Sequence, residues 1–209
     1  MTLSPRKIRE REARKQEILD AARQIFFDKG FHATTMEAIG QRAGFSKGAI
    51  YFYFKSKEEI LVNINCTVLE AFLENLKRIR EQNTVLEEVV RILVNNLRTM
   101  FKIHLVIIDD PVYFTAGPQP LNVPEELSER WYQVMVQILR VIQDLLDHAP
   151  AKATRSQPDS FQYALFILAM GLGVFQLSKV RNEALKKTIA METQIDIFEE
   201  VVLKGLIRE

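Results

Sequence analysis

The chain has 209 residues, of which 47% are hydrophobic, and a formal net charge of +1. This length suits one large helical domain or a small domain joined to a larger one, and the near-neutral charge excludes a polycation. The single cysteine, Cys66, excludes an internal disulfide framework and is interpreted as a small apolar helix residue. Since the first residues also lack the apolar core of an export signal, we expect a cytoplasmic location.

The charge is unevenly placed along the chain. Residues 1–60 carry 12 Lys and Arg against 8 Asp and Glu, whereas the remainder carries 16 against 19. A basic N-terminal part on a mildly acidic body is typical of a head that binds a polyanion. Residues 1–15 contain six basic and two acidic side chains. They fit either a solvated tail or an arm that contacts phosphates or the minor groove of DNA. A first amphipathic helix then ends at Gly30 and is marked by Ile18, Ala22, Ile25 and Phe26.

Residues 34–54 predict two short helices joined by a tight turn. Thr34 and Glu37 have the spacing of a capping box, and Gly44 lies just past the last apolar position of the first helix. Ser46 is expected to cap the second helix. Two short helices joined by a three-residue turn containing glycine form a helix-turn-helix. On the second helix, Ala49, Ile50 and Phe54 are expected to face inward, and Lys47, Gly48, Tyr51 and Tyr53 outward.

The rest of the chain predicts longer helices and no strands, so the fold class is all-α. A loop is expected at residues 111–124, which hold four prolines, and a polar linker at 149–158. The expected helices span Ser56 to about Arg80, about 84–108, Glu125–Asp147, Asp159–Ser178 and Thr193–Ile207.

The helix expected at Asp159–Ser178 is apolar on almost every face. Its strictly apolar part is shorter than the ~20 residues that a membrane span needs, and Gln162 and Gln176 interrupt it. A helix covered by its own domain and by a partner subunit explains this composition better. We therefore expect the two C-terminal helices to form a homodimer interface. The second would contribute the stripe Ile195, Phe198, Val202 and Leu206.

No motif points to catalysis, a metal or a cofactor. The three histidines have no partner at metal-ligand spacing, and there is no phosphate-binding glycine loop or nucleophile elbow. His104, on the apolar stripe of its helix, fits either a core residue or a polar anchor in a ligand pocket, and the aromatic residues share that ambiguity. The pocket candidates are Phe101, His104, Trp131, Met135, Phe166 and Met170.

Specific residue identities narrow the interpretation of the N-terminal 70 residues. The run from Ile39 to Phe45 reads IGQRAGF, and Ser46 to Tyr51 reads SKGAIY. With the FFDKGF run that ends at Phe31 and the FKSKEEIL run that ends at Leu61, they resemble the DNA-binding domain of the TetR/AcrR family of transcriptional regulators. Beyond this region only the size and the helical pattern match.

The resemblance implies a homodimeric, ligand-responsive regulator, most often a repressor, that binds a palindromic double-stranded DNA operator. It implies a basic arm at 1–11, a DNA-binding domain at 12–72 with its helix-turn-helix at 35–54, and a ligand-binding and dimerisation domain at 73–209. By position, Thr35, Tyr53 and Lys57 would bind phosphates. Ser46 would cap the recognition helix, from which Lys47, Gly48 and Tyr51 would enter the major groove.

Two alternatives stay open at this point. A transcription activator could use the same fold, and a ligand carrier or helical enzyme could retain the head without regulating genes. The mostly apolar inner faces favour a hydrophobic small-molecule effector, and nothing favours a membrane partner.

Overall fold

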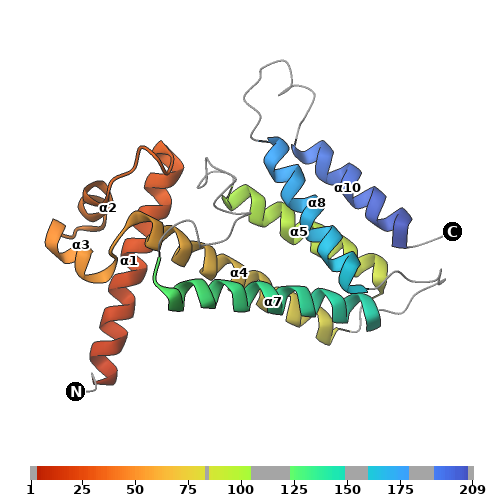
Figure 1. The fold of residues 1–209 in the computed structure, drawn as a ribbon, viewed down its shortest axis with the longest axis horizontal. Coiled ribbons are helices and arrows are strands. Elements are labelled where there is room, and N and C mark those ends of the chain that lie inside the picture. Colours follow the sequence, from red (N-terminus) through yellow and green to blue (C-terminus); the bar gives the residue numbers. More distant parts are fainter. Residues whose placement is uncertain (1–3, 83–84, 105–122, 149–159, 179–190, 207–209) are drawn as a thin grey trace, which may run out of the picture. The chain divides into compact units, whose positions relative to one another are not determined.

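The computed structural model describes residues 4–82, 85–104, 123–148, 160–178 and 191–206, and the regular elements within these ranges are α-helices (Figure 1). This confirms the predicted all-α class. The predicted loop at 111–124 falls largely outside the described residues, and so do the side chains of Phe101 and His104. The helices are α1 (Pro5–Lys29), α2 (Met36–Ala43), α3 (Lys47–Tyr53), α4 (Lys57–Glu81), α5 (Leu86–His104), α7 (Glu125–His148), α8 (Ser160–Ser178) and α10 (Met191–Leu206).

The helices form two compact units. The first contains α1, α2, α3, the beginning of α4 up to Thr67 and the beginning of α7 up to Trp131. The second contains the rest of α4 and α7 together with α5, α8 and α10. Two helices, α4 and α7, are therefore continuous from one unit into the other. No helix in the described ranges has the length and apolar content needed to cross a membrane.

The basic N-terminal segment, expected as a tail or arm, is helical from Pro5 onward. Ser4 accepts a hydrogen bond from the backbone N–H of Lys7 at 3.5 Å, and Pro5 occupies the first helical position, where its missing N–H costs nothing. Exposed ion pairs one turn apart, such as Arg6 with Glu10 at 2.8 Å, support these turns. Residues 5–14 are therefore exposed and form the first turns of α1.

The core of the first unit is formed where α1, α2, α3 and the start of α4 meet. Phe26 of α1 and Phe31, just after that helix, place their ring centroids 5.3 Å apart. Both are fully or almost fully buried, and burying such a side chain contributes about 1.5–3 kcal/mol. Other completely buried side chains of this core are Ile18, Ala22, Ile39, Ile50, Ile60, Leu61 and Ile64.

In the second unit, α10 contacts α5 and α8. Arg98 of α5 pairs with Asp196 of α10 at 2.7 Å. On α10 the buried residues are Ile195, Phe198 and Val202. This corrects the expectation that their stripe faces a partner subunit: it is used inside its own subunit, because α10 needs these residues to cover α5 and α8.

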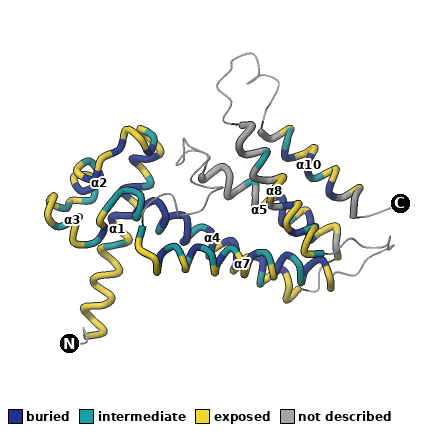
Figure 2. The backbone as a smooth tube through the Cα atoms, viewed as in Figure 1, coloured by how far each residue is buried: buried dark blue, intermediate teal, exposed yellow. Residues whose placement is uncertain are grey.

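Helices α8 and α10 nevertheless carry exposed apolar side chains. Ile197 and Val201 of α10 are each 49% exposed. Much of α8 is likewise exposed (Figure 2). Among the α8 side chains that the structure describes, the large apolar ones that are exposed are Phe161, Leu165, Phe166 and Met170.

Candidate nucleic-acid interface

The beginning of α2 is capped one residue later than the sequence suggested. Thr35 has the extended backbone of an N-cap, and its hydroxyl accepts from the N–H of Ala38 at 3.2 Å. Thr34 is buried and donates its hydroxyl to the carbonyl of Gly30 at 2.7 Å. The predicted Thr34–Glu37 capping box is therefore wrong, because Thr34 closes the preceding turn. Glu37 pairs with α3 instead.

The turn between α2 and α3 depends on two glycines. Gly44 has φ +75°, a left-handed conformation that glycine adopts without strain, and its N–H is directed to the carbonyls of Gly40 and Gln41. A Cβ on Gly40 would lie 3.2 Å from the carbonyl oxygen of Phe45. The bare backbone there lets α2 approach the start of α3 closely, which fixes the angle between the two helices.

Helix α3 begins as predicted, with its apolar side inward. Ser46 accepts from the N–H of Ala49 at 3.3 Å, and Ile50 is completely buried. On the opposite side Lys47 and Gly48 are exposed, and nothing lies within 4 Å of where a Cβ of Gly48 would be. Tyr51 is 37% exposed. The first turns of α3 thus present an open surface that a polyanion can approach.

An ion pair joins α2 and α3 on this surface. The Nζ of Lys47 lies 2.6 Å from Oε1 of Glu37, which is in the first turn of α2. The hydrogen bond from Lys47, helped by its charge, lowers the pKa of the Glu37 carboxyl. The same hydrogen bond raises the pKa of Lys47. The two side chains are 70% and 52% exposed, so both can exchange this partner for another.

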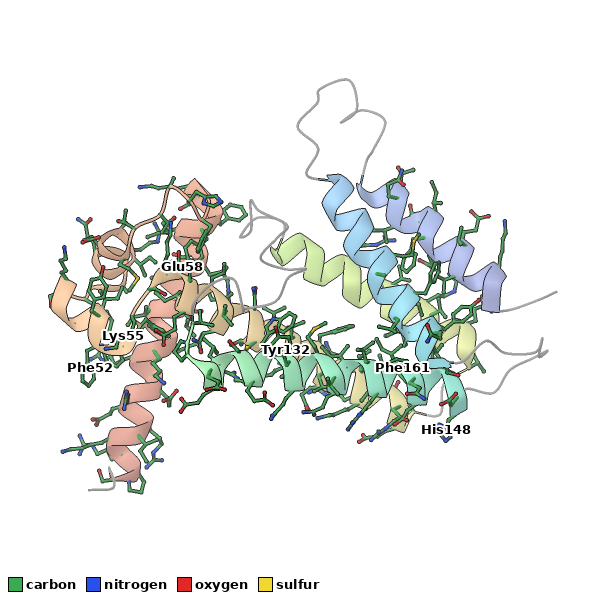
Figure 3. The ribbon with its side chains drawn as sticks, viewed as in Figure 1. Phe52, Lys55, Glu58, Tyr132, His148 and Phe161 are labelled. Carbon is green, nitrogen blue, oxygen red and sulfur yellow. The ribbon has the colours of Figure 1, made fainter. Side chains whose placement is uncertain are left out.

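The C-terminal half of α3 carries aromatic rings that contact one another and α1. Tyr53 packs edge-on against Phe45 at 5.7 Å and against Phe52 at 5.2 Å, so its ring is held within the unit. The guanidinium of Arg11 lies 5.6 Å from the centre of the Phe52 ring (Phe52 is labelled in Figure 3), and that of Arg14 lies 5.9 Å from the Phe45 ring. The basic first turns of α1 are therefore next to the helix-turn-helix.

Lys57 has a different environment from the other candidate cations. Its ammonium donates to the carbonyls of Phe31 at 3.0 Å, His32 at 3.3 Å and Thr34 at 3.1 Å, and it lies 4.5 Å from the Phe31 ring. An ammonium has three N–H donors, so these carbonyls occupy all of them. The resemblance implied a phosphate contact for Lys57. In the structure its charge ties the start of α4 to the segment between α1 and α2.

Sequence reasoning missed three features of this surface: the pairing of Glu37 with Lys47, the exposure of Phe52, and the contact of Arg11 with the Phe52 ring. The pairing of Glu37 with Lys47 could have been predicted, since the two residues fall in the first turns of adjacent short helices. Phe52 is 63% exposed, which is unusual for a large aromatic ring and could not be read from the apolar run around it. The position of Arg11 depended on α1 extending to Pro5.

Of the six pocket candidates, four have described side chains, and these lie on two helices, α7 and α8. Trp131 is buried in α7, and Met135, one turn further, is half-buried. Phe166 and Met170 lie on the outside of α8, at 44% and 38% exposure. Since α8 is apolar all round, its composition could not show which face points inward. The described residues contain no group of His, Cys, Asp or Glu suited to holding a metal ion.

Helices α2 and α3 are short, capped and joined by a tight turn, and the start of α3 is exposed and carries Lys47. This arrangement defines a helix-turn-helix DNA-binding protein. Residues 18–64 match the model of the bacterial regulatory proteins of the tetR family. The N-terminal part of the chain is therefore similar to the helix-turn-helix domain of the TetR/AcrR family of transcriptional regulators.

Individual relatives agree with this assignment. The chain is 39% identical over 84 residues to YfiR, an HTH-type transcriptional regulator of Bacillus subtilis, a match that covers 40% of this chain and 41% of YfiR. Among solved structures, a TetR/AcrR-family regulator from Thermobifida fusca has a TM-score of 0.71 and 22% identity, covering 94% of this chain and 100% of the other.

A further structure is that of SmeT, the repressor of a multidrug efflux pump in Stenotrophomonas maltophilia, solved with triclosan. It has a TM-score of 0.64 and 23% identity, over 94% of this chain and 93% of SmeT. Because both identities are below 25%, these structural matches establish the fold of the chain alone.

Proposed function

We propose that this protein is a homodimeric repressor that leaves a palindromic DNA operator when a hydrophobic small molecule binds. The observation that carries the proposal is the exposed side of α3, where Ser46 caps the helix and Lys47, Gly48 and Tyr51 form an open face. Lys47 would donate to the guanine O6 and N7 atoms in the major groove. Gly48 would allow close approach, and Tyr51 would make apolar contacts with bases.

Phosphates would be held around this helix. Thr35 lies at the N-terminus of α2, where backbone N–H groups and the helix dipole favour an anion. The hydroxyl of Tyr53 and the basic first turns of α1 would bind further phosphates along the backbone. Such contacts set affinity and register, whereas the base contacts of α3 set sequence preference.

The effector would bind at α7 and act through a continuous helix. We propose that it contacts α7 at Trp131 and Met135, which lie one turn apart. SmeT, whose fold is similar, was solved in complex with triclosan, which supports a hydrophobic effector. Because α4 runs from the DNA-binding unit into the second unit, a ligand that prefers one arrangement of α4 changes DNA affinity. Trp131 is the only tryptophan, so its fluorescence reports such binding directly.

The test is to sequence the DNA fragments that the purified protein retains from a random pool. We expect a palindrome with half-sites about 34–36 Å apart, or a multiple of that. Lys47→Ala should weaken operator binding by about 1–3 kcal/mol and relax one base position in each half-site. Lys77→Ala is the matched control, since Lys77 forms a similar exposed ion pair with Glu74 on α4. Retention without any sequence preference would refute the proposal, and promoter output after gene deletion distinguishes a repressor from an activator.

A further inference from the structure

The ion pair between Glu37 and Lys47 joins the two helices of the helix-turn-helix on its exposed side. Glu37 is in the first turn of α2, and Lys47 is the first residue of α3. The Nζ of Lys47 and Oε1 of Glu37 are 2.6 Å apart, and both side chains are more than half exposed. Any DNA that approaches Lys47 closely enough for a base contact therefore also approaches a carboxylate.

A carboxylate in the major groove is selective because it can only accept hydrogen bonds. It is repelled by the phosphates and loses water on binding, so it is tolerated only where a base offers a donor. Glutamate and aspartate characteristically accept from the N4 amino group of cytosine, and lysine donates to O6 and N7 of guanine. A step that presents both groups satisfies the two side chains together.

We infer that Glu37 is a specificity-determining residue, which selects cytosine beside the guanine contacted by Lys47 and lowers affinity for other sequences. The inference rests on the proposed function, because it assigns a second base reader to the same DNA-binding surface. In unbound protein Glu37 holds Lys47. On the cognate site the pair opens and each partner takes a base, whereas on other DNA the carboxylate gains no donor in exchange.

Three variants separate this role from a structural one. Glu37→Ala should abolish the cytosine preference at one position in each half-site, while binding to random duplex DNA becomes tighter. Glu37→Gln should shift that position toward adenine, because an amide pairs with N6 and N7 of adenine. The ratio of operator affinity to random-duplex affinity should fall about tenfold or more in both, which is the usual size of one base contact. Exchanging the charges, with Glu37→Lys and Lys47→Glu, should keep the ion pair yet change the selected sequence.

The control is Glu74→Gln, which removes the same charge from the exposed Glu74–Lys77 pair at 2.7 Å. It should leave both the selected sequence and the ratio of affinities unchanged. The inference is overturned if the Glu37 variants select the wild-type sequence, or if they lose operator and random-duplex binding in equal proportion. If the wild-type protein itself selects no sequence, the proposed function fails and the inference with it. Circular dichroism confirms that each variant keeps its helices.

Discussion

Replacing Lys57 with methionine tests how the DNA-binding unit is held together. The substitution keeps most of the aliphatic stem and removes an ammonium that donates to three carbonyls. The bonds to Phe31 and Thr34 are partly buried, and losing each costs about 1 kcal/mol. The bond to His32 is exposed, so water replaces it. Loss of the cation–π contact with Phe31 adds about 0.5–1 kcal/mol. We therefore expect a loss of about 2–3 kcal/mol.

Urea unfolding followed by the fluorescence of Trp131 measures this loss, since Trp131 belongs to the same compact unit. With a slope of about 1–3 kcal/mol per molar urea, the midpoint should fall by about 0.7–3 M. Lys55→Met is the matched control. Its ammonium makes one exposed hydrogen bond, to the carbonyl of Tyr51 at 2.9 Å, so we expect a change within about 0.5 kcal/mol.

DNA binding distinguishes the internal role of Lys57 from a phosphate contact. If its donors stay on protein carbonyls, Lys57→Met leaves the salt dependence of operator affinity unchanged at temperatures where the unit is folded. A phosphate contact would instead reduce the salt slope by about 1. An unchanged urea midpoint together with a reduced salt slope of operator affinity would refute the internal role of Lys57.

Two further expectations follow from the ion pair and from the surface of α8. Lys47 lowers the pKa of Glu37, so the ion pair persists above that depressed pKa and opens as the pH falls through it. In Lys47→Ala, NMR of the carboxyl groups should show the titration midpoint of Glu37 rising toward that of an isolated glutamate. An unmoved midpoint would mean that the pair is not formed in solution. Leu165 is 39% exposed in the subunit, so Leu165→Glu should convert the dimer to a monomer in sedimentation experiments while the helix content stays unchanged. Phe198 is 3% exposed, so Phe198→Asp should instead unfold the second unit by burying a charge. A Leu165→Glu protein that still sediments as a dimer would exclude this face of α8 as the interface.

The helices themselves were predictable because local signals and tertiary packing agree. Helix α2 shows this agreement, since the apolar residues Met36 and Ile39 are buried and Gly44 ends the helix in a left-handed conformation. The start of α2 was misjudged by one residue, because Thr34 and Thr35 are chemically equivalent caps. Only the tertiary hydrogen bond from Thr34 to Gly30 decides between them.

The functional surface was predictable where a single helix defines it and not where two elements meet. The exposure of Lys47 and Gly48 follows from the periodicity of α3 once Ile50 faces the core. The carbonyl partners of Lys57 could not be predicted in this way, since they lie 23 to 26 residues away in the sequence. The apolar faces of α8 and α10 show the same limit. Their composition predicts that something covers them, but the stripe with Phe198 is covered within the subunit.

The cations of the DNA-binding unit differ in what they must give up to bind a phosphate or a base. Residues 1–60 contain 12 Lys and Arg, yet Lys57 donates to carbonyls and Lys47 donates to Glu37. Arg14 pairs with Glu17 at 2.9 Å, and Arg42 donates to Gln24 at 2.8 Å. Counterion release counts only charges that newly neutralise phosphates, so the salt slope of operator binding should lie well below the number of basic side chains. Affinity then depends on exchanging protein partners for DNA partners. Such an exchange favours the sequence on which both members of the Lys47–Glu37 pair find a new partner.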